Sequence, residues 1–327
     1  MTRSAVVAGS AVPAGVLVVL VVLPPLLTAY QQAVLTEIMI WGLFAMAFDL
    51  LYGYTGMLSF GQAAFFGAGA YGVAFGVLRL GWGTWEALVL GIAVAAACAL
   101  VVGVLAVRVS GHYFLILTIT VSVVAMLILQ SGQWRWLSRG YAASPFAPPA
   151  VPLGPWQLAL TDPLVNYYWV LALVGLSFWL CRRIVRSPLG MVFRSIRENE
   201  QRSRLLGYHV ERFKLVAFVL AGGLSGLSGA LLALTIRYVD ISYFDLSLSG
   251  KAVAWTVIGG AGTLVGAFLG AFVFVLFTDY LSAWTINVPL SIGVLLVVTV
   301  ALAPDGLLGI IRGRVALGAA APTRPAR

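Results

Sequence analysis

The sequence predicts an all-α integral membrane protein, a polytopic bundle of about ten transmembrane helices, and three observations lead to this prediction. Hydrophobic residues make up 61% of the 327 positions and charged residues only 9%, whereas a soluble domain carries about 25% charged residues. The apolar residues fall into long runs. These runs do not alternate polar and apolar side chains as barrel strands do, and only helices and closed barrels pair every backbone group inside a bilayer.

Ten runs are candidate spans, of which eight to ten are expected to cross, some of them short or broken. A full span needs about 20 residues. The segment 250–281 is too long for one span, and Gly259, Gly260 and Gly262 interrupt it, so a short broken helix and then a full one are expected. The first run is expected to stay as a helix, because no small-residue cleavage site follows it. The runs are 11–28, 33–51, 60–78, 85–107, 113–130, 163–181, 213–236, 251–258, 263–281 and 288–302.

The basic residues predict the orientation. Lys and Arg are densest in the segment 182–214, and short cytoplasmic loops carry an excess of these residues. We therefore expect residues 182–212 to form a cytoplasmic loop and both termini, which are also basic, to be cytoplasmic. Residues 131–162 then form an external loop, and 1–327 is a single transmembrane domain. The basic residues that produce the net charge of +9 cluster in short segments between the apolar runs. This distribution is typical of residues that orient a protein in a membrane, rather than of a nucleic-acid-binding surface.

Glycine is frequent, with 36 residues, and several glycines are four positions apart. Small residues at this spacing allow close approach of helix backbones. The candidate packing glycines are Gly72, Gly76, Gly222, Gly226, Gly262, Gly266 and Gly270.

A turn at residues 53–56 separates the second and third runs. Transporters use broken helices to line a pathway, since unpaired backbone is tolerated at membrane depth only beside protein or water. An ordinary cytoplasmic hairpin turn is the alternative. The candidate pathway residues are Gly53, Thr55, Gly56, Ser59 and Gln62.

One short amphipathic helix is expected within the basic loop. Ser187 is a candidate N-cap, Pro188 fits the first helical position, and Gly207 is a candidate end. The apolar side of such a helix needs a cover, which the lipid interface or a groove on a partner protein could provide equally well.

The motifs of the basic loop and several other segments of the chain resemble those of one known protein family. The segments 194–200 (Arg-Ser-Ile-Arg-Glu-Asn-Glu), 206–207, 214–218 and 223–230 resemble the coupling-loop region of branched-chain amino acid ABC transporter permeases of the LivM type. The segments 53–67, 259–266 and 304–306 are similar to other segments of that family, in the same order. Two departures are Gln62, where the family usually has histidine, and the basic pair Arg202 and Arg204, which predicts an acidic patch on a partner.

The resemblance implies the membrane half of an ATP-driven importer in a bacterial inner membrane. A second related permease subunit, two ABC ATPase subunits and an external substrate-binding protein would be its partners. ATP would be bound by the ATPase subunits, so no cofactor is expected on this chain. The residues expected to couple to an ATPase are Arg194, Ile196, Arg197, Glu198, Asn199 and Glu200.

Other functions have weaker support. Gly250-Lys251, placed at the outer start of a helix, is followed by alanine rather than the remainder of a phosphate-binding loop. Two histidines far apart give no metal site. Asp49 and Asp279 could be cast as an intramembrane protease pair, but they lack the usual sequence context. A urea or short-chain amide importer remains an alternative, as do a membrane-embedded enzyme and a standalone secondary transporter.

Overall fold

The computed structural model describes residues 20–109, 111–131, 144–146, 150–153, 156–282, 293 and 306–309. Within these residues, six helices are long and apolar enough to cross a membrane, or seven if a bent pair counts as one span. The all-α membrane class is therefore confirmed. The total of ten crossings and the cytoplasmic termini stay predictions, because half of run 11–28, nearly all of run 288–302 and both chain ends lie outside the described residues.

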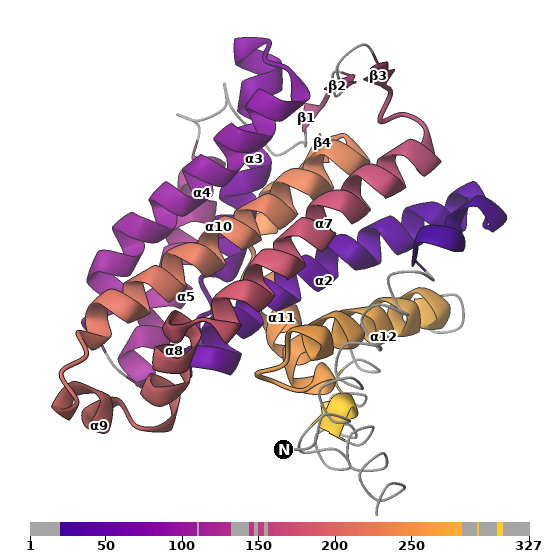
Figure 1. Ribbon diagram of the computed structural model, residues 1–327. Coiled ribbons are helices and arrows are strands. Elements are labelled where there is room, and N and C mark those ends of the chain that lie inside the picture. Colours follow the sequence, from indigo (N-terminus) through magenta and orange to yellow (C-terminus); the bar gives the residue numbers. More distant parts are fainter. Residues whose placement is uncertain are drawn as a thin grey trace, which may run out of the picture.

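The long helices form an elongated bundle (Figure 1). The six single spans are α2 (Ala29–Thr55), α3 (Gln62–Leu80), α4 (Thr84–Ala106), α5 (His112–Gln130), α7 (Pro163–Arg186) and α10 (Val210–Ile236). The bent pair is α11 (Leu246–Gly259) and α12 (Leu264–Ser282), at 112°. The expected short, broken helix before residue 264 is thus present as α11.

The two ends of the bundle differ. At one end lie the short helices α8 (Pro188–Glu198) and α9 (Glu200–Leu205). At the other end β1 (Ser144–Pro145) pairs with β4 (Tyr238–Val239), and β2 (Val151–Leu153) pairs with β3 (Trp156–Leu158), both antiparallel (Figure 1). Two short 3₁₀ turns, η1 (Pro24–Leu26) and η3 (Ile241–Phe244), complete the elements. Because the densest basic residues lie at the α8–α9 end, we treat that end as cytoplasmic.

The expectation of a single helix from 187 to 207 is wrong. Asn199 has an extended backbone, with φ of −160°, and separates α8 from α9. Its side chain accepts a hydrogen bond from the Arg202 N–H at 2.9 Å and so caps α9. An asparagine that starts a new helix stabilises the break.

Helices α4 and α10 pack along facing stripes of small residues. Gly222 lies against Ala99, and Gly226 lies against Ala95 so closely that an added Cβ would overlap the alanine methyl group. On the other side of α10, the backbone of Gly226 touches Gly69 of α3. Without large side chains between them, these three helices gain dispersion contacts along their backbones.

The other candidate packing glycines lie in similar places. A Cβ at Gly72 would lie 2.8 Å from the Cα of Gly91, and one at Gly76 would lie 3.2 Å from the Cα of Ala87, so both face α4. Gly266 and Gly270 face the carbonyls of α11. Gly262 differs, because it lies in the break between α11 and α12 with φ of +81° rather than inside a helix.

We predict that Gly226→Ala destabilises the protein while Gly223→Ala does not. The first methyl group would overlap Ala95, and overpacking costs about 1–3 kcal/mol. The second would lie 3.8 Å from the Ala96 Cβ, an ordinary contact, and removing a helical glycine gains about 0.5–1 kcal/mol. Denaturant unfolding in detergent micelles measures both. Equal stabilities for the two variants would contradict this packing.

Candidate functional site

Helix α8 lies across the cytoplasmic end of the bundle. Its buried side consists of Gly190, Val192, Phe193 and Ile196. Gly190 lies against the Val185 carbonyl with no room for a side chain, which lets α8 turn back closely on α7. Pro188 occupies the first turn as expected. The Ser187 hydroxyl, however, donates to the Ile184 carbonyl at 2.6 Å instead of capping α8.

Arg197 connects α8 to the end of α2, which in turn is bonded to the break between α11 and α12. Its guanidinium donates a hydrogen bond to the carbonyl of Gly53, near the end of α2. One turn earlier, the fully buried Asp49 carboxylate accepts the Gly262 N–H at 2.6 Å, which fixes the break between α11 and α12. The positive charge of Arg197 also acts on Asp49. A buried carboxylate is stable only when hydrogen bonds and an opposite charge compensate it.

Two glycines make this junction possible. A Cβ at Gly53 would overlap the Asp49 carboxylate and the Gly262 nitrogen, and one at Gly262 would lie 2.8 Å from the Arg197 Nη1. The positive φ of Gly262 is also one that other residues rarely adopt. We call Asp49, Gly53, Arg197 and Gly262 the cytoplasmic junction.

A hollow of about 280 Å³ opens beside the cytoplasmic junction. Its lining adds Tyr54, Arg194 and Glu198 to Gly53, Arg197 and Gly262. The Arg194 guanidinium lies 5.4 Å from the centroid of the Tyr54 ring, a cation–π contact. The outward side of α8 at this hollow is charged, whereas its inward side is apolar.

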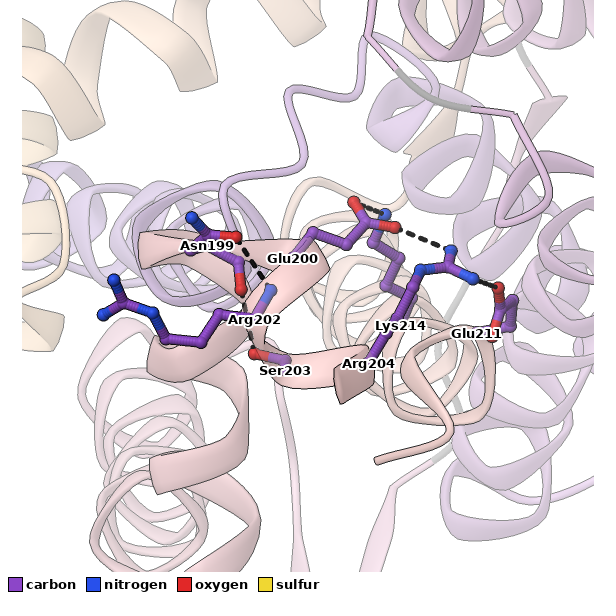
Figure 2. A network of polar contacts seen from close by, with 7 residues as sticks. All are labelled: Asn199, Glu200, Arg202, Ser203, Arg204, Glu211 and Lys214. Atoms are coloured by element: carbon purple, nitrogen blue, oxygen red, sulfur yellow. Dashed lines mark hydrogen bonds and ion pairs between the residues drawn. The ribbon is translucent and has the colours of Figure 1, made fainter. Parts of the chain in front are cut away.

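Helix α9 is held against α10 by a polar network (Figure 2). Glu200 accepts hydrogen bonds from the Lys214 ammonium at 2.6 Å and from Arg204 at 2.9 Å. Arg204 also pairs with Glu211 at 2.6 Å. The Lys214 side chain is only 8% exposed, so Glu200 supplies the counter-charge that this buried ammonium needs. The Arg202 side chain extends away from this network (Figure 2).

The environment of Glu200 lowers its pKa. Partial burial by itself raises the pKa, but the hydrogen bonds from Lys214 and Arg204 and their positive charges outweigh burial, and the net pKa lies below the ordinary value. A carboxylate with a depressed pKa stabilises the folded state at pH values above its unfolded pKa. That stabilisation is lost as the pH falls through the folded pKa.

The segment 56–61 between α2 and α3 is not helical, and hydroxyl groups of other helices bond the backbone of Phe60 within it. The Phe60 N–H donates to Thr118 at 3.2 Å, and the Phe60 carbonyl accepts from Ser122 at 3.2 Å and from Ser249 at 2.7 Å. Ser249 also accepts the Ala63 N–H at 3.0 Å. Helices α5 and α11 thus pair the backbone of this break internally, as membrane depth requires.

The candidate pathway residues lie inside the chain or at the cytoplasmic junction. Ser59 and Gln62 are fully buried, and Gln62 accepts a hydrogen bond from Ser225 at 2.7 Å. The Gln62 amide nitrogen has no hydrogen-bond partner among the described residues. Gly53 belongs to the cytoplasmic junction, Thr55 donates to the Leu51 carbonyl, and Gly56 ends α2 with φ of +77°. A pathway role for these residues stays a prediction.

The candidate coupling residues separate into two groups. Arg194, Glu198 and Asn199 are exposed, and so is Arg197, although its guanidinium also bonds Gly53. The other two turn toward the chain itself: Ile196 is buried, and Glu200 pairs with Lys214. Sequence reasoning did not single out the exposed apolar residues of this end as candidates. They are Met191, Leu205 and Leu206, with 62%, 89% and 67% of their surfaces exposed.

Asp49 and Asp279 do not form a protease pair. Asp279 accepts a hydrogen bond from Tyr30, in the first turn of α2, at 3.1 Å. Asp49 lies nineteen residues further along the same helix, about 28 Å away at 1.5 Å per residue. The two carboxylates therefore cannot act on one bond.

Comparison with known proteins identifies the family. A family described as the permease component of the branched-chain amino acid transport system matches residues 31–303. The chain belongs to this family. The high-affinity branched-chain amino acid transport system permease protein LivM of Salmonella typhimurium is 28% identical over 320 residues, which cover 92% of this chain and 75% of that protein. LivM of Escherichia coli K12 matches with the same identity and coverage.

A second group of relatives matches only part of the chain. The autoinducer 2 import system permease protein LsrC of Klebsiella pneumoniae is 38% identical over 109 residues, or 32% of this chain and 30% of that protein. These relatives are transport permeases, and the resemblance seen in the sequence is confirmed. The chain is thus a multi-pass membrane permease.

We predict that acid and the variant Glu200→Gln both release α9 from α10. A nitroxide attached through Leu205→Cys, with the exposed Cys98 replaced by alanine, should report the release as faster motion. In the parent protein the release should come only as the pH falls below the ordinary pKa of a glutamate, about 4.3. Glu200→Gln should be mobile at neutral pH, because Lys214 loses its partner.

Glu211→Gln is the matched control. It removes only an exposed pair with Arg204, and such pairs contribute about 0–1 kcal/mol. The label should therefore keep its slow motion in this variant. The same fast motion in both glutamine variants, or slow motion in both, would contradict the role given to Glu200.

Proposed function

We propose that this chain is the transmembrane permease subunit of an ATP-driven importer for branched-chain or related amino acids in a bacterial inner membrane. It would form half of the translocation pathway. Membership of the permease family and the similarity to LivM along 92% of the chain support this proposal. The autoinducer 2 relatives are named for a different cargo, so the amino-acid substrate rests mainly on the longer match.

The observation that carries the coupling role is the two-sided attachment of α8. Its outward side is exposed and charged at Arg194 and Glu198. Arg197 ties α8 to α2, and Asp49 of α2 in turn bonds the break before α12. A helix that is open to a partner and bonded to α2, which is itself bonded to that break, can pass a displacement inward.

The partners follow from this role. Two ABC ATPase subunits would bind at the cytoplasmic end and hold the ATP, and this chain would need no cofactor of its own. A second, related permease subunit would complete the pathway, and an external binding protein would deliver the substrate. The exposed leucines of α9 suggest that the ATPase contact includes an apolar part, since charged residues alone rarely form the centre of an interface.

A urea or short-chain amide importer would use the same architecture and differs only in its substrate. The membrane-embedded enzyme and the standalone secondary transporter have less support. Among the described residues no group of three potential metal ligands occurs, and Asp49 and Asp279 are far apart. The characterised relatives are named as parts of transport systems.

We predict that Glu198→Arg and Leu205→Asp each abolish binding of the ATPase subunits without unfolding the permease. Both side chains are exposed, so the fold should tolerate the changes. Leu80→Asp, at the C-terminal end of α3 and 42% exposed, is the control and should bind the ATPases normally. Co-purification of the tagged permease with its ATPase subunits measures binding. Normal recovery with both cytoplasmic variants would count against docking at α8 and α9.

A further inference from the structure

Helix α11 carries a lysine at membrane depth. Its first turns are fixed near the middle of the bundle, because Ser249 hydrogen-bonds Phe60 and Ala63 at the break between α2 and α3. Next to Ala63, Gln62 bonds Ser225 of α10. Ser225 lies about 22 Å along α10 from its cytoplasmic start and about 16 Å from its outer end, at 1.5 Å per residue. Ser249 is therefore close to mid-depth.

Lys251 follows Ser249 by two residues. It lies about 12 Å along α11 from Gly259, where the helix reaches the cytoplasmic junction. The sequence had placed this lysine at the outer start of a helix, but α11 begins at Leu246 and Lys251 lies in its second turn. A charged side chain at this depth is costly beside lipid, so such residues face a water-filled path or a polar partner.

The side of α11 that carries Lys251 is open. Lys251 is exposed, and so is Ser247, one turn earlier on the same face. Between them, a Cβ built on Gly250 meets no atom within 4 Å. Among the described residues, no carboxylate lies within ion-pair distance of Lys251. The ion pairs of this part of the chain are formed by Arg204 and Lys214 instead.

The opposite side of the same helix is packed. Ser249, Ala252 and Thr256 are fully buried there. On the face of Lys251 itself the open stretch ends one turn further on, at the buried Trp255. Helix α11 therefore has one face built for the bundle and one face with a hydroxyl, a bare backbone and an ammonium. The hydroxyl and the ammonium are donors suited to a carboxylate, because an ammonium–carboxylate hydrogen bond is stronger than a neutral one.

We propose that Lys251 binds the carboxylate of the transported substrate as it passes α11, with Ser247 on the same face. This inference rests on the proposed importer function and deepens it, because it specifies a substrate that carries a carboxylate. An amino acid satisfies this requirement. Urea and simple amides, the alternative cargo, have no carboxylate for the lysine to bind.

The first test asks whether the face is aqueous, and it needs no ATPase subunit. Lys251→Cys, in the full chain with Cys98 replaced by alanine and assembled with the second permease subunit in lipid nanodiscs, is treated with a water-soluble anionic thiosulfonate. Because a thiol reacts only where reagent and water reach it, labelling should be at least about tenfold faster than for Val101→Cys. Val101 lies on an apolar exposed side of α4. Equal rates would overturn the proposal.

The second test asks whether the positive charge of Lys251 is required for substrate transport. Uptake of radiolabelled L-leucine by the reconstituted complex should fall about tenfold or more in Lys251→Met, because a charge-assisted hydrogen bond is lost. Lys251→Arg should keep most of the uptake. Arg108→Met, which removes an exposed charge at the cytoplasmic end of α4, should leave it unchanged.

The outcomes separate the competing explanations. Normal leucine uptake by Lys251→Met would overturn the proposal. Loss of the second permease subunit from the Lys251→Met complex would also overturn it. That result would show that Lys251 pairs with a carboxylate of the second subunit rather than with substrate. Failure of the importer proposal itself would look different: the complex with unaltered Lys251 would show no ATP-dependent uptake, while the labelling rates would be unaffected.

Discussion

The hydrogen bond from Arg197 to the Gly53 carbonyl joins the cytoplasmic helix to the membrane bundle, and the functional account depends on it. At the same place Asp49 holds the Gly262 N–H. The end of α2, the break before α12 and helix α8 therefore meet at one point. They can do so only because residues 53 and 262 have no side chains. As long as these hydrogen bonds are intact, a displacement of α8 also displaces the end of α2 and the break before α12.

The same requirement, that backbone groups in a membrane be paired internally, explains the second unusual region. Segment 56–61 leaves the helical conformation, and hydroxyl groups of α5 and α11 bond both backbone groups of Phe60 within it. One of these hydroxyls, Ser249, fixes the start of α11 at mid-depth. The other end of α11 leads into the cytoplasmic junction. Helix α11 thus connects the α8 attachment with the depth at which Lys251 is exposed.

Much of this fold could be predicted from sequence, because long apolar runs and basic loops report directly on the bilayer. The break at Gly259–Gly262 and a helix in the basic loop were predicted for the same reason. The split of that loop into α8 and α9 was missed, since Ser187–Gly207 has a continuous helical pattern and one asparagine cap decides the boundary. The charged pattern alone did not reveal that Ile196 is buried and that Arg197 bonds α2, while Leu205 is exposed.

The junction itself was beyond sequence reasoning. Arg197 and Gly53 are 144 positions apart, and nothing local indicates that an arginine in a docking motif bonds the chain's own backbone. Asp49 was considered as half of a protease pair, and Gly262 was expected to be a packing glycine. The depth of Lys251 was missed because it depends on where Ser249 bonds, and this contact joins two regions distant in sequence.

The most direct test follows the displacement from α8 to α12 in the complex with its ATPase subunits. Spin labels at Met191 and Val101 report the position of α8, and labels at Leu276 and Val101 report that of α12. Adding a non-hydrolysable ATP analogue should change both distances in the parent protein and in Arg202→Ala. In Arg197→Ala the α8 distance should still change while the α12 distance stays fixed. An unaltered α12 response in Arg197→Ala would contradict transmission through the cytoplasmic junction.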